Sequence, residues 1–204
     1  MTGDVLAAMS LGLALAGAPG PVQAVLLAEA VRGGIPRGFR AMAGAAVTFG
    51  FLLTALALGL SLAPPTGLTL RILQAVGGAF LLWLAVDGFR SSHAVGDPSP
   101  ERRALPPSAR GALAVLLNPG AWLFLGAVAS PLFAAAGQTG GTGSALFVAV
   151  ALAVGLAIGD GGVVLLGALG LRRAGDGVIR WIRRGLATLL AGLGVWLLVG
   201  GLMT

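Results

Sequence analysis

One acidic residue stands in a long uncharged stretch of this sequence and is its first candidate for chemistry. Asp160 is flanked by Gly159, Gly161 and Gly162, and it is the only charged residue between positions 111 and 170. A carboxylate at the centre of a membrane helix costs about 2.5–3.5 kcal/mol to insert, so we expect it to face the interior of a helix bundle. Three roles suit it: holding an ammonium group, carrying a proton, or pairing with a neighbouring amide or arginine.

Two apolar runs are interrupted by proline next to glycine. The interruptions comprise Pro19, Gly20 and Pro21 in the first run and Asn118, Pro119 and Gly120 in the second. Proline removes a backbone donor and opens a helix, and the freed backbone groups are tolerated in a membrane only where they face protein or a water-filled cavity. The positive end of a half-helix that starts at Pro21 suits a carboxylate. We expect the side chains of Asn118 and Gln23 to line the same cavity.

The composition excludes a soluble domain. Of the 204 residues, 57% are hydrophobic and only 10% are charged, the 35 glycines are additional, and the mean hydropathy is +0.96. A soluble domain has about 25% charged residues. The chain contains no cysteine, which excludes disulfides and thiol chemistry, and its one histidine, His93, lies in a polar stretch where we expect a solvated loop. We therefore expect a lipid bilayer around the chain, and neither a metal site nor a cofactor.

Apolar runs of about 20 residues predict an all-α membrane protein with six transmembrane helices. The predicted spans cover about 5–30, 41–63, 70–90, 111–136, 145–171 and 185–203, with a polar loop at 93–110. The two breaks fall in the first helix of each group of three. Because three is odd, the second group enters the membrane from the opposite side. This is the arrangement of two inverted repeats, at 1–92 and 111–204, and such breaks point to a transporter's midplane site.

The arginines predict the orientation of these spans. Twelve of the thirteen basic residues, all of them arginine, lie in the first, third and fifth connections: Arg32, Arg37, Arg40, Arg90, Arg102, Arg103, Arg110, Arg172, Arg173, Arg180, Arg183 and Arg184. Basic loops stay in the cytoplasm, so we expect both termini outside. This asymmetry accounts for the high isoelectric point without a nucleic-acid partner. We interpret Glu29 and Asp87 as interface ion pairs with Arg32 and Arg90.

Four segments resemble the LysE/RhtB family of bacterial amino-acid exporters. They are PGPVQAVLLAEAVRGGIPRG at 19–38, LQAVGGAFLLWLAVDGFRSS at 73–92, LLNPGAWLFL at 116–125 and RWIRRGLATLLAGLGVWLL at 180–198. The first resembles the family's PGP motif with its downstream RGG turn. The resemblance implies a small multi-pass protein of the bacterial inner membrane that exports an amino acid or related metabolite, driven by the proton or membrane-potential gradient.

Two departures from the family pattern bear on the site. The residue after PGP is often Asn and is here Val22. The second helix usually carries a Gly-Asp pair, and here those positions hold Thr48 and Phe49. The absence of that acid makes Asp160 the more important candidate.

Other classes of function fit the sequence less well. An intramembrane aspartyl protease needs a second aspartate in the middle of the membrane, and a serine protease needs a histidine there; neither is present in the middle of a predicted span. We therefore expect no enzyme. An exporter of a different solute or of a cation, and a non-transport assembly protein, remain alternatives. The expected partner is a small zwitterionic substrate, and the sequence leaves open whether the chain forms a homo-oligomer.

Overall fold

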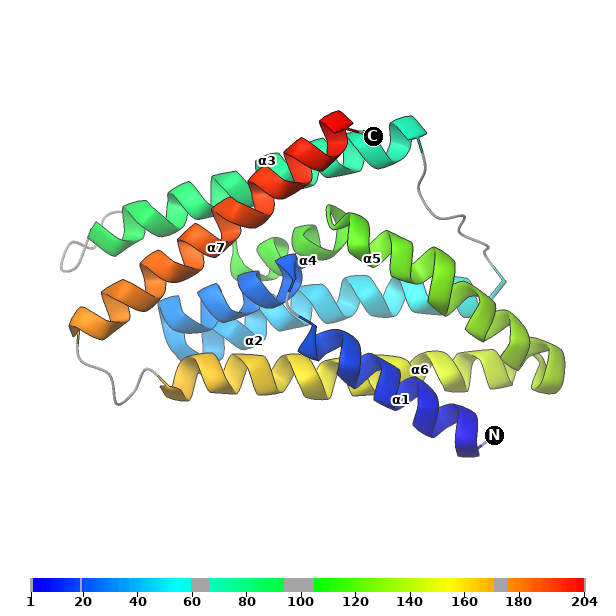
Figure 1. The fold of residues 1–204 in the computed structure, drawn as a ribbon. Coiled ribbons are helices and arrows are strands. Elements are labelled where there is room, and N and C mark those ends of the chain that lie inside the picture. The colour runs from blue at the N-terminus through cyan, green and yellow to red at the C-terminus, as the bar shows by residue number, and fades with distance from the viewer. Residues whose placement is uncertain (1, 19, 60–66, 94–104, 171–175, 204) are drawn as a thin grey trace.

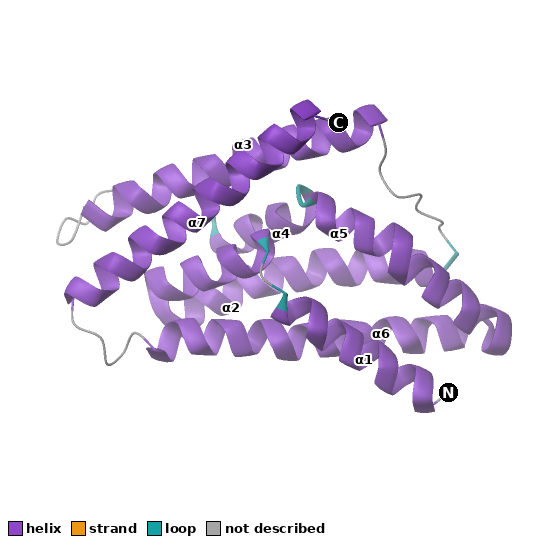
Figure 2. Cartoon of the chain, in the orientation of Figure 1, coloured by secondary structure: helices purple, strands orange, loops and turns teal. Residues whose placement is uncertain are grey.

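The computed structural model describes residues 2–18, 20–59, 67–93, 105–170 and 176–203. All regular secondary structure in these ranges is helical, which confirms the predicted all-α class (Figure 2). The elements are α1 (Thr2–Gly17), α2 (Pro21–Ala57), α3 (Gly67–His93), α4 (Pro107–Leu116), α5 (Pro119–Phe124), the π-helical turn η2 (Leu125–Ala129), α6 (Ser130–Gly170) and α7 (Asp176–Met203).

Four helical stretches are long and apolar enough to cross a membrane. They are Pro21–Ala57, Gly67–Val86, Pro119–Leu169 and Arg184–Gly201, and a shorter apolar helix covers Gly3–Gly17. A single crossing needs about 20 residues, so the first and third stretches are too long to cross only once. Each of them bends sharply at a pair of glycines.

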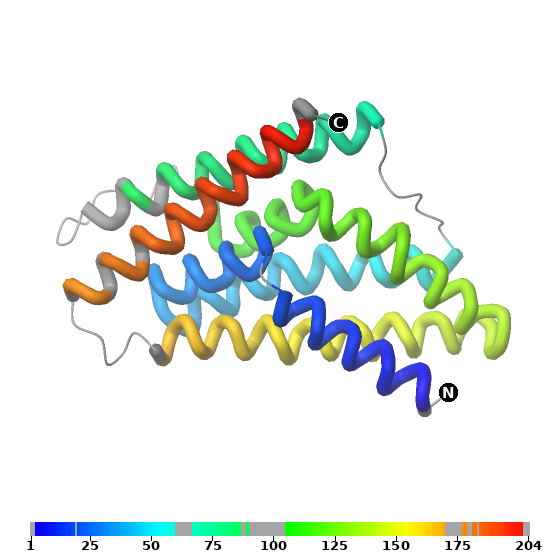
Figure 3. Tube along the Cα trace, viewed as in Figure 1, coloured from blue at the N-terminus to red at the C-terminus, as the bar shows by residue number. Residues whose placement is uncertain are grey.

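The two bends have nearly the same backbone geometry. Gly33 and Gly34 adopt φ, ψ angles of −140°, 21° and 69°, −163°, and Gly140 and Gly141 adopt −139°, 18° and 67°, −173°. The second glycine of each pair occupies the left-handed region, which residues with a Cβ rarely adopt. Two residues are therefore enough to reverse the chain, and the two bends lie at opposite ends of the bundle (Figure 3).

The helix boundaries differ from those expected at the first bend. Residues 31–40, expected to connect the first two spans, are helical on both sides of the Gly33–Gly34 bend. The second bend falls inside the turn expected at 137–144. The helix α3 continues to His93, so this residue ends a helix rather than lying in a loop, and its side chain is outside the described part.

The helices pack chiefly in four pairs: α2 with α6, α3 with α7, α1 with α6, and α2 with α4. The pair α3 and α7 runs along one side of the bundle, at the top of Figure 1, and α6 with α1 along the opposite side. Both termini point toward the same end of the bundle, on the right of Figure 1. The start of α7 and the end of α6 lie at the other end, which we call the basic end.

Glycines allow two pairs of helices to cross in contact. A Cβ added at Gly12 or Gly155 would overlap a backbone oxygen of the facing helix in the α1–α6 crossing, and the same holds for Gly44 and Gly111 in the α2–α4 crossing. The oxygens met by Gly12, Gly155, Gly44 and Gly111 are those of Leu152, Met9, Ser108 and Ala41, respectively. The spacing is the same in both crossings: on each helix, the two contacting residues are three positions apart in the sequence.

Candidate functional site

A cavity of about 340 Å³ lies where the two helix breaks come together. Its wall is formed by the end of α1, the start of α2 and Phe49 farther along it, the start of α5, the middle of α6, and the halves of α3 and α7 that lie away from the basic end. The lining residues are Leu15, Ala18, Gly20, Pro21, Val22, Gln23, Phe49, Leu70, Gln74, Asn118, Pro119, Gly120, Ala121, Leu123, Leu156, Asp160, Trp196 and Leu197. This volume lies within the range of pockets that hold small molecules.

Asp160 and Gln23 form the polar centre of this cavity. The side chain of Asp160 is only 2% exposed, and the Nε2 of Gln23 donates a hydrogen bond of 3.3 Å to its Oδ1. Gln23 stands in the first turn of α2, directly after the first break, because Pro21 opens that helix. The first helical hydrogen bond there runs from the amide of Ala24 to the oxygen of Gly20, at 2.9 Å, so the amides of Val22 and Gln23 precede it.

The second break is stabilised by local hydrogen bonds. Asn118 caps α5, because its side-chain oxygen accepts a hydrogen bond of 3.0 Å from the amide of Gly120. The indole Nε1 of Trp122 donates a bond of 2.7 Å to the carbonyl of Leu116, the last residue of α4. These bonds satisfy groups that the break removes from the helix, as buried backbone requires.

The structure brings together seven of the eight residues singled out from the sequence. Gly20, Pro21, Gln23, Asn118, Pro119, Gly120 and Asp160 all line the one cavity, and Pro19 lies outside the described residues. Sequence reasoning missed the wall contributed by Phe49, Gln74 and Trp196. Gln74 gave a signal, because it is a polar residue in an otherwise apolar stretch of α3, but nothing local to α3 or α7 indicated that they face the breaks.

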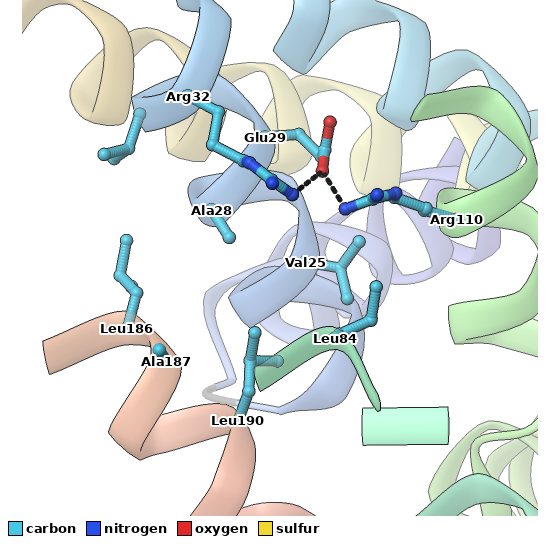
Figure 4. A pocket seen from close by; sticks show the side chains of 10 residues that line it. Val25, Ala28, Glu29, Arg32, Leu84, Arg110, Leu186, Ala187 and Leu190 are labelled. Atoms are coloured by element: carbon cyan, nitrogen blue, oxygen red, sulfur yellow. Dashed lines mark hydrogen bonds and ion pairs between the residues drawn. The ribbon is translucent and has the colours of Figure 1, made fainter. Parts of the chain in front are cut away.

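A second polar cluster lies between the cavity and the basic end. Glu29 on α2 is 2% exposed, and its carboxylate lies 3.0 Å from Nη1 of Arg110 and 3.7 Å from Nη1 of Arg32 (Figure 4). The same carboxylate lies 2.6 Å from Nε of Arg37. The expected pair of Glu29 with Arg32 is present, but Glu29 is buried and has closer partners. The side chains of the other expected pair, Asp87 and Arg90, lie outside the described part.

Arg110 connects this cluster to the chain just before α4 and to α3. Its Nε donates a bond of 3.0 Å to the carbonyl of Leu105, and its guanidinium lies 5.5 Å from the centroid of the Trp83 ring on α3. On the other side of the cluster, a small cavity of about 30 Å³ separates Glu29 and Arg110 from Leu186 and Leu190 of α7 (Figure 4).

Metal ligands do not gather in the part of the chain that the structure describes. No group of three or more histidine, aspartate or glutamate side chains there could hold a metal ion. The candidate site is a buried carboxylate, three amide side chains and the starts of two helices around a largely apolar space.

Comparison with protein families gives one match. The family described as LysE type translocator matches residues 13–201, which is nearly the whole chain. No curated protein and no solved structure matches the chain significantly.

Proposed function

Because the chain belongs to the LysE type translocator family, whose members are membrane transporters and not enzymes, we propose that it exports an amino acid or a close zwitterionic derivative. Export would run from the cytoplasm across the bacterial inner membrane. The observation that carries this proposal is the cavity between the two helix breaks, with the buried carboxylate of Asp160 in its wall.

The groups in the cavity complement the two charges of a zwitterion. Asp160, oriented by Gln23, offers a carboxylate to an ammonium group. The start of α2 offers the amides of Val22 and Gln23 and the positive end of the helix dipole to a substrate carboxylate. In the same space, Asn118 and Gly120 present the start of α5. In an alternative role, Asp160 would carry the coupling proton instead of holding the ammonium group. We assign the driving force for export to the proton gradient or the membrane potential.

The backbone supports an organisation in two inverted three-helix repeats, 1–92 and 111–204. The matching bends at Gly34 and Gly141 and the matching crossings of α1 with α6 and of α4 with α2 are what such a repeat would produce. In transporters built this way, one part rocks against another around a site near the midplane. The pair α3 and α7 is a candidate for the moving part, because it packs mainly on itself.

We further propose that the basic end faces the cytoplasm and that both termini face outward. The distribution of arginines supports this orientation. The cluster of Glu29 with Arg32, Arg37 and Arg110, which we call the Glu29 cluster, would then close the cavity on its cytoplasmic side. Separation of these side chains would admit the solute from the cytoplasm.

Transport by the purified protein tests the proposal directly. Proteoliposomes loaded with an equimolar mixture of the twenty common amino acids are compared with protein-free vesicles, with and without an imposed proton gradient and potassium diffusion potential. We expect at least one amino acid to leave the protein-containing vesicles faster, and the gradient to accelerate its exit. If no amino acid leaves faster under any gradient, the proposal is wrong, and an exporter of another solute or an assembly protein becomes the better interpretation.

A further inference from the structure

The two helix crossings define which residue of one half corresponds to which residue of the other. In the α1–α6 crossing the close contacts on α6 are at Leu152 and Gly155, and in the α2–α4 crossing those on α2 are at Ala41 and Gly44. Ala41 thus corresponds to Leu152, and Gly44 to Gly155. Continuing this register by five residues pairs Phe49 of α2 with Asp160 of α6.

These two corresponding residues meet in the same cavity. Phe49 is 6% exposed and Asp160 is 2% exposed, and both line the space between the breaks. The two halves therefore bring equivalent positions to one place, where one half supplies a carboxylate and the other supplies an aromatic ring. The site therefore combines a carboxylate with a bulky apolar side chain beside it.

The rest of the lining is mostly apolar. Its polar side chains are Gln23, which hydrogen-bonds to Asp160, and the amides of Gln74 and Asn118. Large apolar side chains from four helices complete the apolar wall: Leu15, Leu70, Leu156, Trp196 and Leu197. A second charge on a substrate's side chain would have to lose its water against this wall with no partner of opposite charge, which is strongly unfavourable.

Phe49 also limits the size of the cavity. A second space of about 370 Å³ lies between α2 and α6, and it shares only Phe49, Leu156 and Asp160 with the lining of the first. The phenyl ring therefore stands in the wall between the two spaces. Shortening it to a methyl group would remove one of the three side chains that separate them and enlarge the first space.

We propose that Phe49 determines which side chain the substrate carries: it forms an apolar subsite beside Asp160 that selects amino acids with an apolar side chain of limited size and rejects those with a second charge. This inference rests on the proposed function and specifies its substrate class. It predicts that the chemistry of the residue at position 49, rather than the stability of the fold, sets the ratio in which different amino acids are exported.

The test measures ratios of exit rates from proteoliposomes loaded with equal concentrations of alanine, leucine, phenylalanine and lysine. For the wild type, we expect leucine or alanine to leave at least about tenfold faster than lysine, since an unpaired buried charge is costly. Phe49→Asp should reverse the order of leucine and lysine by supplying a second carboxylate. Phe49→Ala should raise the exit of phenylalanine relative to leucine several-fold.

The matched control is Phe133→Ala, because Phe133 is a buried ring, 2% exposed, that does not line the cavity. This variant should lower the amount of folded protein but leave the ratios unchanged. Unchanged ratios in both Phe49 variants would overturn the inference while leaving the proposed function intact, as would a wild type that prefers lysine. A wild type that moves none of the four, nor any other amino acid, would overturn the proposed function and this inference with it.

Discussion

The carboxylate of Glu29 on α2 lies 3.0 Å from Nη1 of Arg110 on α4, and both side chains are almost completely buried, at 2% and 1% exposed. The two helices flank the breaks: α2 begins directly after the first, and α4 ends directly before the second. The pair therefore joins the two half-helices on the basic side of the cavity. Buried charges are tolerated only when they are paired, so this arrangement of α2 and α4 depends on the pair.

Glu29→Gln should lower the stability of the protein strongly. The variant leaves the guanidinium groups of Arg110 and Arg37 beside a neutral amide, and breaking a buried pair costs about 3–5 kcal/mol because an uncompensated charge remains. The measurement is thermal unfolding of the purified protein in detergent. Arg32→Gln is the control, because Arg32 is 17% exposed and lies 3.7 Å from the same carboxylate, so we expect about 1 kcal/mol or less. Equal losses of stability in the two variants would contradict the claim that burial of the Glu29–Arg110 pair makes it important for stability.

Asp160→Asn should abolish most of the export while leaving insertion and folding intact. A hydrogen bond to a charged group contributes about 1.5–3 kcal/mol, which corresponds to a reduction of roughly 10- to 150-fold in the exit rate at low substrate concentration. Exit from proteoliposomes gives the rate, and gel filtration in detergent gives the folded fraction. Asp4→Asn is the control, because Asp4 is an exposed residue near the start of α1, remote in sequence from both breaks. Full export by Asp160→Asn would exclude the role that we propose for this carboxylate.

The breaks and Asp160 were predictable because their signals are local. Proline interrupts a helix wherever it stands in the interior, and a charge in an apolar run must find the inside of the bundle. The first bend falls inside the connection expected at 31–40, but the helical residues on both sides of it were not predicted, because Arg32, Arg37 and Arg40 indicated a loop. The structure keeps those arginines on helices: the Gly33–Gly34 pair reverses the chain in two residues, and Glu29 balances the charge of Arg32 and Arg37.

The wall that faces the breaks was not predictable from the sequence. Phe49, Gln74 and Trp196 reach the cavity from three helices, and only the packing of those helices brings them together. Phe49 in particular is indistinguishable in sequence from Phe51, two residues later, which is 75% exposed on the outer surface of the same helix. Which of the two faces the cavity is decided by the crossing of α2 with α4, and that is a property of the tertiary structure.

Gly155→Ala should destabilise the crossing of α1 with α6. The added methyl group would overlap the carbonyl oxygen of Met9, so the helices would have to separate, and overpacking of this kind costs about 1–3 kcal/mol. Thermal unfolding in detergent measures the loss. Gly162→Ala is the matched control on the same helix, because nothing lies within 4 Å of a Cβ added there. Because alanine has the higher helix propensity, the control should keep or gain stability, and a loss as large as that of Gly155→Ala would contradict the explanation by close packing.

The proposed orientation is testable with single cysteines, because the native chain has none. Gly3 near the start of α1 and Gly177 near the start of α7 are both exposed, and an added Cβ at either has nothing within 4 Å, so both should accept cysteine without loss of stability. With basic loops in the cytoplasm, a membrane-impermeant maleimide added to intact spheroplasts should label Gly3→Cys, and it should label Gly177→Cys only after the membrane is opened. The cysteine-free wild type gives the background. The reverse pattern would place the Glu29 cluster on the outer side of the cavity, and the step that it controls would then be release of the solute rather than its entry.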